Sequence, residues 1–142
     1  MKMTEASKEV QDGWLAGLLD GEGSIIVSFG RDGDLQMRAL IANTNVELLE
    51  TVREVMDCGS VDIASNRWMC TTRNVEKLLD RVEPYLIVKR TRAALARALF
   101  TTIKPGTNQS DNSPEHLARV LLRKKLLELW ESTVKVHRTK IA

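Results

Sequence analysis

Two carboxylates that follow an apolar, helix-like segment are the residues whose placement most strongly indicates chemistry. Residues 13–19 read Gly-Trp-Leu-Ala-Gly-Leu-Leu, and Asp20 and Glu22 come directly after them, before Gly23. The helix dipole disfavours anions at a helix C-terminus, so acids at this place favour a functional site over a stabilising role. The alternative is that both carboxylates are solvated side chains in a turn.

Small residues on the same helix predict a close contact with a second helix. Gly13 and Gly17 lie four residues apart with Ala16 beside them, and each interior glycine costs roughly 1 kcal/mol relative to alanine. Small residues at this spacing let two helix backbones approach closely, so we expect a dimer interface of Gly13, Ala16 and Gly17. Pairing across a two-fold axis would bring two copies of Glu22 together.

Such a pair of carboxylates repels itself unless it is protonated or binds divalent cations. Carboxylate and carbonyl oxygens are the ligands that Mg²⁺ prefers, and metals held in this way activate water and stabilise phosphodiester leaving groups. The segment therefore predicts metal-dependent phosphodiester chemistry at Glu22.

The elements that position these residues alternate between helices and hairpins. We expect a first helix from about Thr4 or Ser7 to Leu19, stopped by residues 21–23, and further elements by the periodicity of their apolar residues. These are strands 24–29 and 35–43, a helix from its cap Asn45 to about 57, a hairpin of 61–64 and 67–71 across 65–66, a helix 74–83 capped by Asn74 and ended by Pro84, a helix 86–103, a polar loop 104–112 and a helix 114–136.

This order, αββαββα followed by two more helices, predicts an α+β fold with a four-stranded antiparallel sheet that carries helices on one face. A length of 142 residues predicts a single domain, 1–142, with its core at about 7–103. In the first helix Val10, Trp14, Leu15 and Leu18 follow helical spacing. In the second strand the core face is expected to hold Leu35, Met37, Ala39 and Ile41. The opposite, mostly polar face of the sheet either faces water or, as a twisted ribbon, fits the DNA major groove.

Composition and charge narrow the class of protein. Apolar residues make up 43% of the chain and charged residues 28%, which excludes wholesale disorder, and no apolar run is long enough to span a membrane. Residues 1–85 hold 9 Lys/Arg and 15 Asp/Glu, whereas residues 86–142 hold 12 and 4, and this basic half favours a polyanionic partner such as nucleic acid. The N-terminus has no apolar signal region, and two cysteines form no disulfide framework. We therefore expect a protein that is not secreted and lies in the cytoplasm or nucleoid, or in an organelle.

Other site classes are excluded by spacing. Cys58, Cys70, His116 and His137 lack the close pairs of a standard zinc finger, and the two distant histidines give no support for a catalytic triad. The two cysteines are expected to be buried apolar residues. The sequence also has no phosphate-binding glycine loop of nucleotide type, so no small-molecule cofactor is expected.

Residues 15–23, Leu-Ala-Gly-Leu-Leu-Asp-Gly-Glu-Gly, resemble the signature of the LAGLIDADG homing endonucleases, with Gly-Glu where that family often has Ala-Asp or Gly-Asp. The expected αββαββα order is also the family's, and the similarity covers about 7–103. A single copy of the motif resembles the homodimeric branch of the family. The resemblance implies a homodimeric, Mg²⁺- or Mn²⁺-dependent endonuclease of intron homing that makes staggered cuts, with 3′ overhangs, in a long pseudo-palindromic site in double-stranded DNA.

Site residues carry over from the family position by position. The last acid of the motif is the family's metal ligand, here Glu22, with the Gly21 carbonyl nearby. Residues 84–90, Pro-Tyr-Leu-Ile-Val-Lys-Arg, look like the segment that puts a lysine into the active site, here Lys89; the alternative is a lysine in the first turns of a basic helix. Asn43, after the second strand, matches a polar residue that orients water, and its alternative is a turn or cap residue. The sequence departs from some homodimeric relatives just beyond, where Asn45 and Val46 replace a basic residue.

DNA contacts are expected from the outer sheet face and from basic residues after it: Ser28, Arg31, Gln36, Arg38, Arg67, Thr71, Arg90 and Arg92. A second hypothesis is a non-cleaving nucleic-acid-binding protein on the same fold, either an RNA maturase for intron splicing or a DNA regulator. The presence of Glu22 and Lys89 favours the enzyme, and the missing basic residue favours the binding protein.

Overall fold

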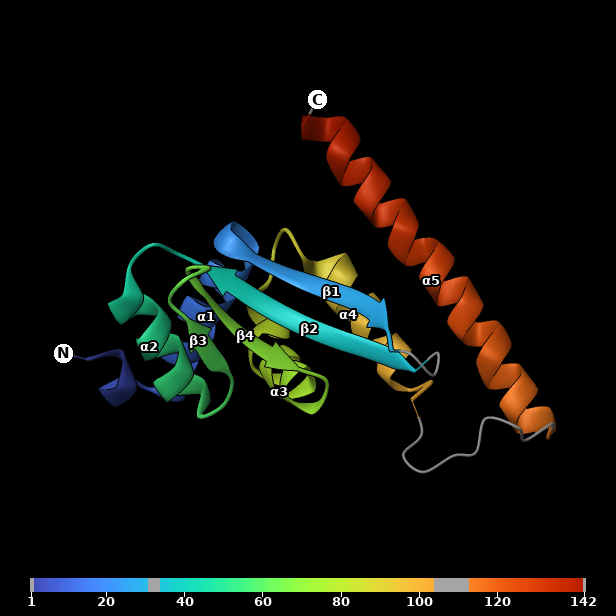
Figure 1. Ribbon diagram of the computed structural model, residues 1–142, viewed down its shortest axis with the longest axis horizontal. Coiled ribbons are helices and arrows are strands. Elements are labelled where there is room, and N and C mark those ends of the chain that lie inside the picture. The colour runs from blue at the N-terminus through green and yellow to red at the C-terminus, as the bar shows by residue number, and fades with distance from the viewer. Residues whose placement is uncertain (1, 31–33, 104–112, 142) are drawn as a thin grey trace. The chain divides into compact units, whose positions relative to one another are not determined.

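The computed structural model of the chain describes residues 2–30, 34–103 and 113–141 (Figure 1). Its elements in chain order are η1 (Met3–Glu5), α1 (Lys8–Glu22), β1 (Gly23–Phe29), β2 (Leu35–Ala42), α2 (Val46–Met56), β3 (Ser60–Asp62), β4 (Arg67–Thr71), α3 (Arg73–Val82), η2 (Glu83–Tyr85), α4 (Arg90–Phe100) and α5 (Pro114–Ile141). The chain divides into two compact units, Met1–Arg90 and Thr91–Ala142, and the single domain remains a prediction.

The first unit is built on a four-stranded antiparallel sheet in the order β1-β2-β4-β3. Helices α1 and α3 contact β2 on one face of this sheet, and α2 contacts β4 and β3 (Figure 1). The predicted core face of β2 is confirmed, because Leu35 is 5% exposed and the three other side chains are fully buried: Met37, Ala39 and Ile41. The α+β architecture with helices on one face is therefore as expected.

Helix α1 is longer than the sequence predicts, because Gly21 does not stop it. The helix begins at the cap Ser7, whose Oγ accepts from the Val10 N–H at 3.3 Å, and continues to Glu22. It ends at Gly23, whose N–H donates to the Leu19 carbonyl. A Cβ at position 23 would lie 2.6 Å from Leu19 Cδ1 and 2.8 Å from Leu19 Cα, so only glycine fits this helix-to-strand junction. Glu22 is thereby the last helical residue.

Helix α1 buries one side in the core of the first unit. Asp12, Leu15, Ala16 and Leu19 are buried, whereas Val10 is 55% exposed. Trp14 and Leu18 are only partly buried. The helical spacing of Val10, Trp14, Leu15 and Leu18 does not mark a core face, because Leu15 is the one member of this series that is fully buried. The remaining three side chains lie outside the core of the unit.

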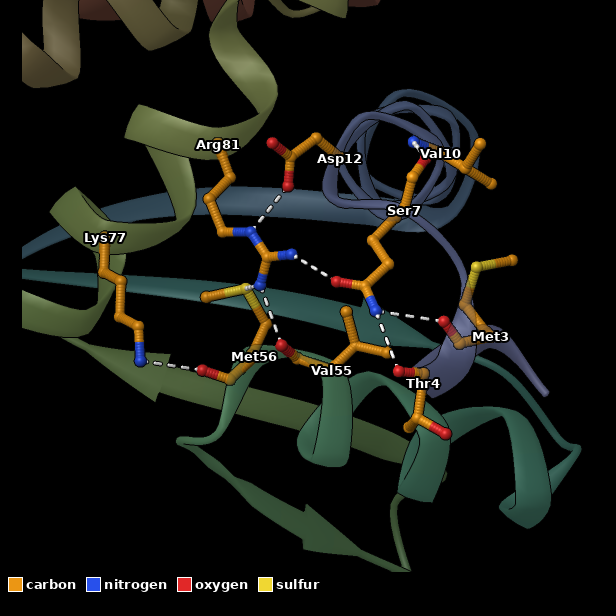
Figure 2. A network of polar contacts seen from close by, with 10 residues as sticks. Met3, Thr4, Ser7, Val10, Asp12, Val55, Met56, Lys77 and Arg81 are labelled. Atoms are coloured by element: carbon orange, nitrogen blue, oxygen red, sulfur yellow. Dashed lines mark hydrogen bonds and ion pairs between the residues drawn. The ribbon is translucent and has the colours of Figure 1, made fainter.

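A buried ion pair connects α1 to α3 and to the end of α2 (Figure 2). Arg81 Nε donates to Asp12 Oδ1 at 2.6 Å, and both side chains are nearly buried, with 14% and 10% exposure. The two other guanidinium nitrogens of Arg81 donate to the Val55 carbonyl at 2.8 Å and to Gln11 Oε1 at 3.0 Å. Lys77 Nζ donates to the Met56 carbonyl at 2.8 Å. These two cations satisfy carbonyls in the last turn of α2, where the helix dipole favours positive charge.

Replacing Arg81 by Met should lower the free energy of unfolding by roughly 3 kcal/mol, because the Asp12 carboxylate would stay buried without its partner. Arg53→Met is the matched control, since Arg53 and Glu50 form a pair at 2.7 Å with 47% and 39% exposure. That control should cost less than about 1 kcal/mol. Urea denaturation of both variants measures the difference, and equal losses would contradict the stated role of Arg81.

The second hairpin has a wider turn than predicted. Strand β3 ends at Asp62 and β4 begins at Arg67, so four residues separate them, not the two of a tight hairpin. Asp62 Oδ1 accepts from the Ser65 N–H at 3.3 Å, and Asn66 adopts a left-handed φ of 54°. The Asp62 side chain thus closes a local turn that replaces two pairs of the ladder.

The caps of the following helices are partly as expected. Asn45 Oδ1 accepts from the Leu48 N–H at 3.2 Å, which confirms the start of α2. Helix α3 is preceded by Thr72, not capped by Asn74, because the chain turns there at a φ of 39°. It ends at Val82, and Pro84 lies in the short η2 that follows. The helix that was expected to begin at residue 86 begins only at Arg90.

The second unit contains most of α4 and all of α5. Ser113 Oγ accepts from the His116 N–H at 3.2 Å, which confirms the predicted start of α5, and the helix continues past the predicted end to Ile141. Arg123 donates to Thr102 Oγ1 at 3.1 Å and to its carbonyl at 2.7 Å. The polar loop 104–112 lies outside the described residues. Within the described part of the chain, no helix has the length and apolar character needed to cross a bilayer.

Candidate functional site

The turn after β2 places Asn43 against the acid that ends α1. The pairing of Gly23 with Ile41 brings the start of β1 beside the end of β2, so the residues that flank these strands are neighbours. Asn43 Nδ2 donates to Glu22 Oε2 at 2.7 Å, and Asn43 Oδ1 accepts from the Asn45 N–H at 2.8 Å. Asn43 is thus a turn residue and a partner of Glu22 at once, because the turn fixes its amide with the nitrogen toward the carboxylate.

Lys89 reaches the same end of α1. Its Nζ donates to the carbonyl of Asp20 at 3.0 Å, in the last turn of the helix, where the carbonyls have no intrahelical donor. Lys89 directly precedes α4, which begins at Arg90, and its role in a reaction stays a prediction. A cation that the sequence separates from Glu22 by more than sixty residues therefore lies beside the motif.

The Asp20 carboxylate is not a solvated turn residue. Its two oxygens accept from the backbone N–H groups of Ile87 at 2.8 Å and of Lys89 at 3.0 Å. A helix over 86–89 would direct these N–H groups elsewhere. The contact with Asp20 therefore explains why α4 starts at Arg90 and not at the predicted Leu86.

The donor groups at this end of α1 suit a hard divalent cation. The exposed Glu22 carboxylate and the Gly21 carbonyl supply oxygen, the donor type that Mg²⁺ prefers. Among the residues that the structure describes, no group of three or more His, Cys, Asp or Glu could hold a metal ion. The chemistry of the two donors fits Mg²⁺, but their number is below the six ligands that it takes.

The cysteines lie apart from this chemistry. Cys70 is 2% exposed, and burial raises the pKa of its thiol to about 12. Cys58 is half-buried, and burial raises its pKa as well. Both are therefore neutral thiols at pH 7, which agrees with the expectation of apolar residues for Cys70 and only in part for Cys58.

One side of α1 presents bare backbone. A Cβ built at Gly13, Gly17 or Gly21 would meet no atom within 4 Å. Ala16, which the sequence groups with these glycines, is 1% exposed and belongs to the core of its own unit. The exposed side is therefore formed by the glycines, with Val10 at its edge, and Ala16 is not part of it.

The predicted DNA-contacting residues of the sheet lie on one face. Side chains on this outer face alternate with the buried ones and form rows across the strands. The register gives the rows Ala42–Arg67–Asp62, Ser24–Leu40–Met69–Ser60, Ile26–Arg38–Thr71 and Ser28–Gln36. Leu40, which sequence reasoning left out, belongs to this face, and the alternation along β2 was the signal that identifies it.

The basic residues of this surface differ in what they already contact. Arg67 stands opposite Asp62, and hydrogen bonds from Ser65 hold the pKa of Asp62 below its usual value, so this face keeps a negative charge. Arg90 is exposed, and its Nε donates to the Leu86 carbonyl at 3.2 Å. Arg31 lies outside the described residues.

Arg92, in the second unit, stacks on an aromatic ring. Its guanidinium lies 4.2 Å from the centroid of Trp130, and partial burial lowers its pKa. This contact joins α4 to α5, and a cation–π pair of this kind stabilises the unit itself. Contact of Arg92 with DNA stays a prediction.

No family model matches the chain, and comparison with curated protein sequences finds no match. Comparison with solved structures does find similar proteins. The homing endonuclease I-CvuI in complex with its target has a TM-score of 0.66 and 21% identity over 86% of this chain and 83% of that one. The homing endonuclease I-TnaI gives 0.59 and 18%, over 81% and 96%. The DNA-bound LAGLIDADG meganuclease I-AabMI gives 0.59 and 21%, over 79% of this chain and 43% of that one. This chain therefore has the fold of the LAGLIDADG homing endonucleases.

Proposed function

We propose that this protein is a divalent-metal-dependent endonuclease that cuts double-stranded DNA as a homodimer. The observation that carries the proposal is the contact between Asn43 and Glu22 at the end of α1, with Lys89 on the adjacent Asp20 carbonyl. An acid, an amide and a cation from three separate parts of the chain meet where the resemblance to the family requires them. I-CvuI and I-AabMI, which share the fold, are described in complexes with DNA.

The chain's own groups divide the work at the scissile phosphate. Glu22 and the Gly21 carbonyl would hold a divalent cation, which supplies Lewis acidity and an activated water when bound. Asn43 holds the Glu22 carboxylate in place through its Nδ2, and its second amide hydrogen is available to orient water. Lys89 supplies positive charge where negative charge develops at the phosphate.

A second copy of the chain would complete the site. Each chain has one motif, whereas cutting two strands near one axis takes an acid for each strand. The glycine side of α1 allows two helix backbones to approach closely, which brings two copies of Glu22 together and adds the missing carboxylate ligand. An isologous dimer repeats each contact about its axis, so the preferred site is approximately palindromic.

The outer sheet face would read the bases. An antiparallel ribbon fits the major groove, where arginine recognises guanine through two hydrogen bonds and apolar side chains contact the thymine methyl. Arg38, between Ile26 and Thr71, is suited to guanine. Leu40 and Met69 form an adjacent apolar pair suited to thymine.

Selection from a randomised DNA pool tests this function. The protein is incubated with the pool in Mg²⁺, in Mn²⁺ and in EDTA, and the newly cut ends are ligated to an adaptor and sequenced. We expect an enriched, approximately palindromic site in the two metal arms and none in EDTA. Cut ends without a common sequence, or cutting in EDTA, would contradict the proposal.

A non-cleaving nucleic-acid-binding protein on the same fold is the second candidate. It is favoured by the absence of the basic residue that some relatives have where this chain has Asn45 or Val46. The Asn45 side chain caps α2 by accepting from the Leu48 N–H. Such a protein would be an RNA maturase or a DNA regulator. In the same selection, the DNA that stays bound to it would be enriched in one sequence, and no cut ends would appear.

A further inference from the structure

We propose that Asp20 is a positioning residue for Lys89, so that the motif has two acids with separate tasks. The inference rests on the proposed function, because it assigns a role in cleavage. Glu22 faces solvent and the site, whereas the Asp20 carboxylate is engaged by the residues before α4, which we call the 86–89 segment. Asp20 acts on the reaction through Lys89, without contact with the phosphate.

Three contacts join Asp20 to this segment. The two carboxylate oxygens each accept one backbone N–H, from Ile87 at 2.8 Å and from Lys89 at 3.0 Å, and the Asp20 carbonyl accepts from Lys89 Nζ at 3.0 Å. Hydrogen bonds to an ionised acceptor are about twice as strong as neutral ones. Asp20 therefore restrains the backbone of Lys89 and the tip of its side chain at once.

The side chains in the middle of the 86–89 segment contribute little to its position. Ile87 is 79% exposed and Val88 is 63% exposed, so neither side chain gives it a place in the core. At one end of the segment Leu86 is fully buried, and its carbonyl accepts from Arg90 Nε at 3.2 Å. Without the carboxylate, the N–H groups of Ile87 and Lys89 would lose the acceptors that hold them at the end of α1. The Lys89 ammonium would then lose its fixed distance from Glu22.

The same observations separate this role from a contribution to folding. The core of the unit around α1 is formed by Leu15 and Leu19, which are fully buried, whereas Asp20 is only partly buried and follows Leu15 by five residues, which turns it away from that side of the helix. The contact with the Ile87 N–H is exposed. Loss of the carboxylate should therefore change melting temperature little, while it changes the rate of cleavage.

Asp20→Asn is the central test, because asparagine keeps the size but presents an NH₂ group to one of the two N–H donors. The single-turnover cleavage rate should fall by roughly 10- to 100-fold, the usual effect of removing a group that orients a site residue, with the DNA dissociation constant unchanged. Hydrogen exchange at the amides of Ile87 and Lys89 should become faster. Asp57→Asn, at the exposed end of α2, is the matched control and should alter none of these values.

A double-mutant cycle decides whether the effect passes through Lys89. In a Lys89→Met background, Asp20→Asn should cause no further loss of rate. A full further loss, an unchanged rate in the single variant, or unchanged amide exchange would each overturn the inference. If Asp20→Asn does not fold, Asp20→Glu takes its place in the same measurements. A wild-type protein that cuts no DNA would refute the proposed function, whereas a cutting wild type with an unaffected Asp20→Asn variant would refute this inference alone.

Discussion

Glu22→Gln should abolish cleavage and leave sequence-specific DNA binding intact. Glutamine keeps the shape of the side chain and can still accept from Asn43 Nδ2, which lies 2.7 Å from the carboxylate oxygen in the wild type. It removes the negative charge that would hold the cation. Loss of several kcal/mol of metal-dependent stabilisation corresponds to a fall of about 10³-fold in rate, at roughly 1.4 kcal/mol per tenfold.

The measurement is single-turnover cutting of a selected site in Mg²⁺, beside DNA binding in Ca²⁺ and in EDTA. Glu54→Gln, an exposed substitution of the same kind on α2, is the control and should cut like the wild type. Full cutting by Glu22→Gln would remove Glu22 from the metal site. Loss of binding in EDTA would show that Glu22 shapes the reading surface, contrary to its place at the end of α1.

Gly17→Leu should give a folded monomer that makes no double-strand break. In one chain a Cβ at this position meets nothing within 4 Å, and leucine is a better helix former than glycine by nearly 1 kcal/mol. The single subunit should therefore be as stable as the wild type or slightly more so. Between two closely packed helices the same side chain overfills the contact and should weaken association by more than about 3 kcal/mol.

Sedimentation velocity, free and on DNA, measures the assembly, and conversion of a supercoiled plasmid to linear DNA measures the double-strand break. Ala94→Leu introduces the same side chain at an exposed site of α4 and should leave both unchanged. Gly17→Ala should weaken the dimer less than Gly17→Leu does. A wild-type monomer on DNA, or a Gly17→Leu dimer with normal cutting, would place the interface elsewhere.

The fold could be predicted because local patterns agree with most of the helices and strands that the structure describes. Alternation in β2, the cap Asn45 and the pair Ser113-Pro114 each gave the correct element. The ends of α1 and the start of α4 could not be predicted locally. Helix α1 passes through Gly21 and stops where Leu19 leaves no room for a Cβ, and α4 is delayed by Asp20, an acid 67 residues before the Ile87 whose N–H it accepts.

Part of the candidate site could be predicted from the resemblance to the family, since Glu22, Asn43 and Lys89 do gather at the end of α1. What the sequence does not show is which partner each polar group has. Asp12 lies in an apolar stripe of positions and is buried only because Arg81, from α3, neutralises it. Ala16 and Gly17 are neighbours of similar size, yet one faces the core and the other solvent, which depends on the packing of α1.

The alternation of side chains along β1 and β2 has a consequence for how such a protein can acquire new targets. Even-numbered positions such as Ser28, Gln36 and Arg38 lie on the outer face, while the odd-numbered Met37 and Ala39 fill the core. If the outer face reads DNA as proposed, substitutions at the even positions can change recognition without opening a cavity. Insertion of a single residue into β2 would exchange the two sets and unfold the unit. Under the proposed function, specificity would therefore diverge through point substitutions and not through insertions or deletions within these strands.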